Sequence, residues 1–220
     1  MSTTELLAAY DAQLRMEAEV ADATEWHRHG PLVRARWGDS GFVSGRDLSG
    51  LTAGELEALV TDTLAWFRDE TSVTEVEWKT RRHDRADLLD LLTHHGFVAD
   101  EEETVMVGRA DLLDRPVDLP DGLVVRRAGE GGDLREDVTR AGLLQAEVFG
   151  HAPRELEERL TGYAEEPERT GLWIAETADG QVVCSGRLDV VPGTEFAGLW
   201  GGGTRADWRG RGIYRALVAA

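Results

Sequence analysis

The sequence predicts an α/β (α+β) protein made of two units. Strand-like alternation and helix-like periodicity of apolar residues follow one another along the whole chain. A stretch rich in proline and aspartate, residues 111–122, interrupts this pattern near the middle and predicts a linker between domains 1–110 and 123–220. The composition is 41% hydrophobic and 30% charged, which is typical of a globular protein, and 220 residues suffice for two small domains.

The composition also excludes several classes of protein. No apolar run is long enough to span a bilayer, and residues 1–20 are too acidic for a signal peptide, so a cytoplasmic protein without a membrane partner is expected. The single cysteine, Cys184, excludes a disulfide framework and a multi-cysteine metal site, and is predicted to be a buried core thiol. A formal net charge of −18 argues against nucleic-acid binding.

The first unit begins with an amphipathic pattern over residues 5–20, which predicts a helix. Residues 26–31 break the pattern. His27 and His29 in this stretch could form a pair of metal ligands, but no third ligand follows at a recognisable spacing, so we predict a solvated loop and no metal. A hairpin is predicted next, over residues 32–37 and 41–44.

Helix signals then alternate with strand signals. Thr52 and Glu55 form a capping-box pattern that opens a helix, and residues 73–80 predict a strand. Asp84 is placed to cap a short leucine-rich helix that Gly96 would end, and residues 103–107 predict a further strand.

The second unit has a predicted order of strand, helix, helix, three strands in a meander, and helix. The two helices have start signals at Asp133–Glu136 and at His151–Pro153. The strands are predicted at residues 123–127, 172–177 and 181–191 and at the apolar run that begins with Phe196.

The chemistry of the sequence is concentrated in residues 196–220. An apolar run gives way to glycines, then to Arg209-Gly-Arg-Gly212 and the start of an amphipathic helix. Such a strand, turn and helix start presents free backbone N–H groups and the positive end of a helix dipole, which attract anions. Residues 205–215 hold four arginines and one aspartate in an otherwise acidic chain. The stretch therefore predicts an anion-binding site.

Two familiar anion-binding motifs fit this stretch poorly. A P-loop requires Gly-Lys-Ser/Thr after its glycines, which is absent. Residues 201–206 match the dinucleotide spacing G-x-G-x-x-A, but a hairpin precedes them and no acidic residue follows about twenty positions on.

A third comparison rests on residues 207–217, Asp-Trp-Arg-Gly-Arg-Gly-Ile-Tyr-Arg-Ala-Leu. They resemble the R/Q-x-x-G-x-G/A signature of the GNAT superfamily of acyl-CoA-dependent N-acyltransferases. The resemblance implies that acetyl-CoA or another acyl-CoA is the co-substrate and that backbone amides of the signature hold its pyrophosphate. The final Gly/Ala of the signature is Tyr214 here, so its ring must point away from the phosphates or close over the cofactor. The cofactor-binding residues implied are Gly203, Thr204, Arg209, Gly210, Arg211, Gly212, Ile213 and Tyr214.

Residues 76–107 resemble, more weakly, the second half of the same fold without its signature. The chain is thus similar to a tandem GNAT protein with a degenerate N-terminal domain, each unit holding a mixed, mostly antiparallel sheet flanked by helices. The family's fold continues for a further strand, helix and two strands after the signature helix, which here reaches the end of the sequence. We expect residues outside this sequence, the first unit, or a second copy in a homodimer to supply those strands.

The reaction implied by the resemblance is attack of an acceptor amine, on a small molecule or a peptide, at the thioester carbonyl. A base must take a proton from the amine, and Glu195 is the candidate because it would open the strand beside the thioester. The alternative for Glu195 is a solvated turn residue after Pro192-Gly193. The alternative for the protein is a non-catalytic acyl-CoA-binding or regulatory module.

Overall fold

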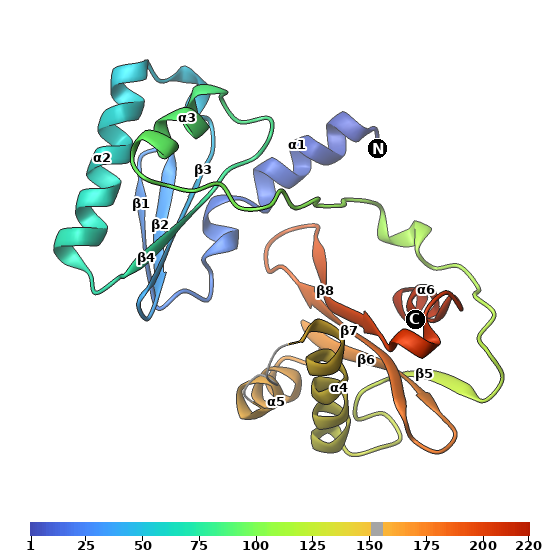
Figure 1. Ribbon diagram of the computed structural model, residues 1–220. Helices are drawn as coiled ribbons and strands as arrows, with labels where there is room; N and C mark the ends of the chain where they lie inside the picture. The colour runs from blue at the N-terminus through green and yellow to red at the C-terminus, as the bar shows by residue number, and fades with distance from the viewer. Residues whose placement is uncertain (151–155) are drawn as a thin grey trace. The chain divides into compact units, whose positions relative to one another are not determined.

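A computed structural model describes residues 1–150 and 156–220. The chain divides into two compact units, Met1–Val107 and Gly108–Ala220 (Figure 1). Each unit contains one four-stranded sheet with helices packed against it. The predicted α+β fold class is therefore confirmed.

The sheet of the first unit is mixed and has the order β1-β2-β3-β4. The first three strands are antiparallel neighbours joined by tight turns, as the predicted hairpin requires. β4 runs parallel to β3, which is possible because the long helix α2 connects them. The strands are β1 (Glu25–His29), β2 (Leu32–Trp37), β3 (Ser40–Gly45) and β4 (Glu75–Lys79).

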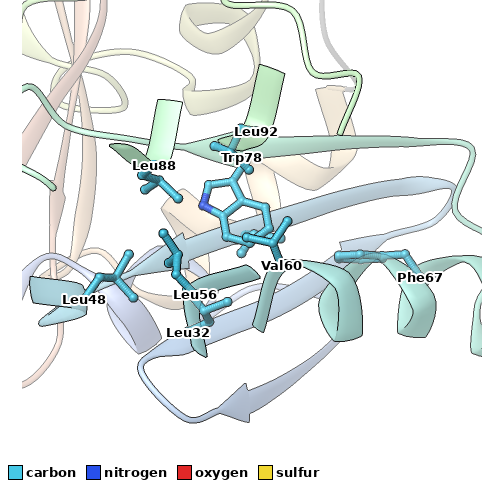
Figure 2. Packing of buried hydrophobic residues seen from close by; sticks show 9 residues of the cluster. Leu32, Leu48, Leu56, Val60, Phe67, Trp78, Leu88 and Leu92 are labelled. Atoms are coloured by element: carbon cyan, nitrogen blue, oxygen red, sulfur yellow. The ribbon is translucent and has the colours of Figure 1, made fainter. Parts of the chain in front are cut away.

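Helices cover both faces of this sheet. On one face α2 and α3 bury a core around Trp78 of β4 and Phe67 of α2 (Figure 2). On the other face Met16 and Val20 pack against Val33 of β2. The helices are α1 (Thr3–Gln13), α2 (Ala53–Glu70) and α3 (Asp87–His94), with 3₁₀ turns at Met16–Glu19 and Leu48–Gly50. The predicted capping box of α2 is confirmed, since Thr52 and Glu55 exchange side-chain to backbone hydrogen bonds.

Gly41 of β3 lies where the core permits no side chain. A Cβ atom at this position would lie 2.7 Å from Cε1 of the buried Phe67 and 2.9 Å from a methyl group of Val73. We expect Gly41→Ala to lower the free energy of unfolding of the first unit by about 1–3 kcal/mol through overpacking. Urea denaturation followed by tryptophan fluorescence measures this. Gly54→Ala is the control, because nothing lies within 4 Å of its Cβ position; equal midpoints for the two variants would contradict the prediction.

Three sequence predictions in the first unit are wrong. Residues 25–29 form strand β1 rather than a loop. β1 is an exposed edge strand, so its side chains are mostly polar and lack the alternation by which strands are predicted. Residues 103–107 form no strand, and within the described residues they pair with no other strand; Met106 is 91% exposed. Asp84 does not cap α3, whose N-cap is Ala86, because its carboxylate binds Arg15 and the Arg81 N–H instead.

The second unit has the predicted order of elements around the antiparallel sheet β5-β6-β7-β8. The predicted helix start at His151–Pro153 lies outside the described residues. The strands are β5 (Leu123–Arg127), β6 (Thr170–Thr177), β7 (Val182–Val190) and β8 (Ala197–Thr204). The helices are α4 (Leu134–Phe149), α5 (Leu156–Glu165) and α6 (Ile213–Ala219), with 3₁₀ turns at Ala110–Leu112 and Ala206–Trp208.

The two faces of this sheet carry different helices (Figure 1). α4 and α5 cover one face, where Val138 and Leu144 pack against Ile174. α6 covers the other face, where Ile213 and Leu217 pack in one cluster with Val183 and Cys184. Cys184 is buried, as predicted, and its burial raises the pKa of the thiol. β8 is an edge strand of this sheet, and α4 and α6 contact it from opposite faces.

A buried ionic network fixes α4 to the sheet. The Asp137 carboxylate, fully buried, accepts hydrogen bonds from Arg126 of β5, from Arg140 and from the Gly129 N–H. Glu176 of β6 pairs with the same two arginines at 2.6 and 3.0 Å. Burial alone would raise the pKa of Asp137, but the three hydrogen-bond donors outweigh it and lower this pKa to about 2. The network therefore requires a charged carboxylate.

Candidate functional site

Strand β8 carries a β-bulge in its glycine run. Ser185 of β7 pairs with Gly203 and Arg187 pairs with Trp200, so three steps along β8 oppose two along β7. Gly201, inside the bulge, has a φ of +59°, which only glycine adopts without strain. Bulges interrupt the hydrogen-bond ladder and are frequent beside binding sites. This bulge was not predicted from the sequence, although the three consecutive glycines were its signal.

Helices from both layers reach this part of β8. The Gln145 side chain of α4 donates a hydrogen bond of 3.0 Å to the Gly201 carbonyl. On the other face the Tyr214 ring of α6 covers Gly202; a Cβ atom there would lie 2.6 Å from the tyrosine hydroxyl oxygen. The far edge of β8 pairs with no strand in the described part of the chain. The bulged glycines are thus held from both faces while their edge stays open.

The turn after β8 is braced by its own arginines. Arg209 donates from Nε to the Thr204 carbonyl at 3.0 Å, and Arg211 donates to the Asp207 carbonyl at 2.9 Å. The Arg211 guanidinium also lies 4.8 Å above the Trp208 ring. Both arginine residues are nevertheless exposed, so their remaining donors face solvent.

Five successive amides of this turn carry no hydrogen bond to any described residue. They belong to Gly210, Arg211, Gly212, Ile213 and Tyr214. Gly210 and Gly212 both adopt left-handed backbone conformations, with φ of +74° and +76°. Unpaired N–H groups beside exposed guanidinium groups are suited to an anion with several oxygen atoms, such as a pyrophosphate.

Tyr214, which stands where the signature has Gly or Ala, lies across two strands. Its ring packs against Gly202 of β8 and Gly186 of β7, the residue is 41% exposed, and its N–H has no partner among the described residues. Burial of the hydroxyl, and to a smaller extent the nearby Cys184, raise its pKa, so the hydroxyl is protonated at neutral pH.

Glu195 lies apart from these residues. It is exposed and sits in the loop between β7 and β8, two residues before the strand begins. Nine residues of extended chain separate it from Thr204, which corresponds to about 30 Å. The structure therefore groups the eight predicted cofactor residues at one end of β8 and places the predicted base beyond the other end.

The described residues hold no group of three or more His, Cys, Asp or Glu side chains suited to a metal ion. Among their helices, none has the length and apolarity needed to cross a membrane.

Solved structures with the same fold as this chain are known. It has the fold of GCN5-related N-acetyltransferases. One such protein, from Kribbella flavida, superposes with a TM-score of 0.60 at 15% identity over 94% of this chain and 79% of that one. Another, from Sphaerobacter thermophilus, gives a TM-score of 0.56 at 20% identity over 86% of this chain and 64% of that one. No protein-family model and no curated protein sequence matches the chain.

Proposed function

We propose that the chain transfers an acyl group, most simply acetyl, from acyl-CoA to an amine of a small molecule or peptide. The observation that carries this proposal is the open, bulged edge of β8 leading into five unpaired amides and two exposed arginines. The likeness of the fold to that of two N-acetyltransferases supports it.

In this proposal the turn binds the coenzyme and β8 binds its arm. Arg209 and Arg211 neutralise the pyrophosphate, and the amides of residues 210–214 donate to its oxygen atoms. Gly203 and Thr204 offer backbone groups to the pantetheine part. Backbone N–H groups at the bulge are placed to polarise the thioester carbonyl. No metal is required for any of these roles.

The proposed reaction is a direct displacement. The acceptor nitrogen forms a bond to the thioester carbon, the carbon–sulfur bond breaks, and the electron pair leaves with the sulfur. A cationic acceptor first gives one proton to a base, a second proton leaves the nitrogen as the amide forms, and the thiolate takes up one proton. The many carboxylates of the chain, which has a net charge of −18, favour the approach of a cationic amine.

One variant tests Glu195 as the base. If Glu195 accepts the amine proton, Glu195→Gln lowers kcat at neutral pH by about 100-fold or more and leaves KM for acetyl-CoA unchanged. Steady-state kinetics across pH 6–9 measure this. The control is Glu130→Gln, an equivalent loss of charge at another exposed position. Wild-type kcat in Glu195→Gln would assign Glu195 to the solvated loop alone.

The first unit is proposed to be a GNAT-like partner domain without a coenzyme site. Its β3 and β4 stay paired from Ser40 and Glu75 to Ser44 and Lys79, so no gap opens between them for a pantetheine arm.

The proposed domains are residues 1–110 and 123–220, joined by a linker at residues 111–122, and the proposed location of the protein is the cytoplasm. The proposed dimer is one in which a second copy supplies a strand that splays away from β8, so that the pantetheine arm lies between the two; sedimentation velocity tests it.

The rival function is a non-catalytic acyl-CoA-binding or regulatory module. Release of free thiol from acetyl-CoA in the presence of a panel of small amines and peptides separates the two. The enzyme proposal predicts release that depends on an amine. Coenzyme binding without release from any amine would favour the binding module.

A further inference from the structure

The first unit contains a polar cavity that the proposed acyl transfer does not use. Its volume is about 530 Å³, within the usual range for small-molecule sites. Its walls are α1 and the loops that follow β3 and β4. These two strands are parallel neighbours, so both loops leave the same end of the sheet, where ligands bind in open α/β sheets.

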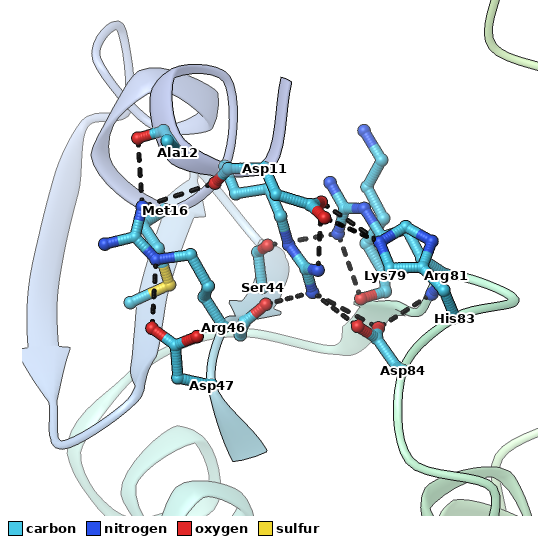
Figure 3. Close-up of polar contacts among 12 residues, drawn as sticks. Asp11, Ala12, Met16, Ser44, Arg46, Asp47, Lys79, Arg81, His83 and Asp84 are labelled. Carbon is cyan, nitrogen blue, oxygen red and sulfur yellow. Dashed lines mark hydrogen bonds and ion pairs between the residues drawn. The ribbon is translucent and has the colours of Figure 1, made fainter. Parts of the chain in front are cut away.

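The floor of the cavity is an ionic network around Arg15, whose buried Nε has no hydrogen-bond partner among the described residues (Figure 3). Arg15, only 5% exposed, donates to Asp84 at 2.9 Å, to Asp11 at 3.3 Å and to the Gly45 carbonyl. Asp84 also accepts the Arg81 N–H. The two inner carboxylates hold the buried guanidinium of Arg15 in place. Over the whole lining, three arginines and three aspartates balance in formal charge.

The rim, in contrast, carries donors without acceptors among the described residues. Arg46 uses Nη1 to bind the carbonyls of Asp11 and Ala12, which leaves Nη2 without a partner. Its Nε lies 3.4 Å from Asp47, whose side chain is 85% exposed. His83 donates from Nε2 to Asp11 at 2.9 Å; its Nδ1 has no partner and is a donor only when the ring is protonated. The hydroxyl of the exposed Ser49 has none either.

We propose that this cavity binds a small organic acid through Arg46, His83 and Ser49. The Arg46 guanidinium, the Ser49 hydroxyl and the protonated ring of His83 donate to the acceptor oxygens of a carboxylate, and the balanced charge of the lining does not repel it. α1 buries no residue of its own, so polar bonds such as those from Arg46 and His83 hold it against the unit. A bound acid that bridges this rim would therefore stabilise α1 as well.

The test is calorimetric titration of the full chain with citrate, malonate and inorganic phosphate at constant ionic strength, with chloride as reference. We expect citrate or malonate to bind, with affinity at least ten-fold weaker in Arg46→Gln and several-fold weaker in Ser49→Ala. Arg82→Gln, an exposed arginine outside the cavity, should bind as the wild type does. Hydrogen exchange should slow in residues 3–13 when the acid is bound.

The outcome does not depend on acetyl-CoA, so it separates this site from the proposed acyl transfer. Absence of binding above chloride would overturn the proposal, as would unchanged affinity in both rim variants. Binding of phosphate without either carboxylate would overturn the assignment to an organic acid. If Arg46→Gln fails to fold, Ser49→Ala decides, because that hydroxyl makes no hydrogen bond in the free protein.

Discussion

Asp137→Asn should destabilise the second unit by about 3 kcal/mol, the largest effect we expect from a single substitution. The variant keeps the shape of the side chain but removes the charge that Arg126 and Arg140 surround. The two guanidinium groups then share only Glu176, in a site where water does not replace the lost partner. Chemical denaturation measures the change. Asp121→Asn, at an exposed turn, is the control for loss of one negative charge.

The same network predicts how stability depends on pH. The folded-state pKa of Asp137, about 2, lies below its ordinary value of 3.8. The stabilisation is therefore complete above about pH 4 and is lost as the pH falls from about 4 towards 2. Its size is roughly 2 kcal/mol. Asp137→Asn should lack this part of the acid dependence. A variant with wild-type stability at pH 7 and an unchanged acid profile would contradict the role given to the network.

Arg209→Ala combined with Arg211→Ala should weaken binding of acetyl-CoA by about 100-fold or more. Each guanidinium supplies charge-assisted hydrogen bonds to phosphate, worth about 1.5–3 kcal/mol apiece. Arg209 also braces the turn through the Thr204 carbonyl, so Arg209→Lys, which keeps the charge, should lose less affinity than Arg209→Ala. Isothermal titration with acetyl-CoA measures all three variants.

The matched control for the arginine pair removes the same charge elsewhere on the second unit. Arg135 is exposed and Arg169 is half-buried, and among the described residues each forms an ion pair with one exposed glutamate. Arg135→Ala combined with Arg169→Ala should bind acetyl-CoA within about two-fold of the wild type, since screening limits the reach of surface charges. An equal loss of affinity in both double variants would show that net charge, not the turn, controls binding.

Local signals made most of the elements predictable. Thr52 and Glu55 determined the start of α2 because a capping box involves residues three positions apart. Gly96 ends α3 as expected, with a φ of +91° and N–H bonds back to the last turn. The glycines and arginines of residues 201–212 likewise belong to one continuous stretch. These features depend on neighbours in the chain, which the sequence displays directly.

Features that depend on distant residues could not be predicted in the same way. Asp84 was expected to cap α3, but Arg15, sixty-nine residues away, binds its carboxylate. Asp137 lies in the first turn of α4, and no signal in the sequence indicates that Arg126 of β5 and Glu176 of β6 join it in one network. The bulge at Gly201 exists only through the register of β7 against β8. Strand β1, polar on its exposed side, is recognisable only from its pairing with β2.

The central claim is that the bulged strand β8 and the turn after it bind acyl-CoA. Isothermal titration of the unmodified chain with acetyl-CoA tests it most directly. We predict saturable binding with one coenzyme per chain, weakened by salt because the turn contributes arginines, and lost in the Arg209→Ala, Arg211→Ala variant. The claim would be contradicted if folded protein gave no heat of binding with acetyl-CoA at millimolar concentration and free coenzyme A did not compete with acetyl-CoA for the protein.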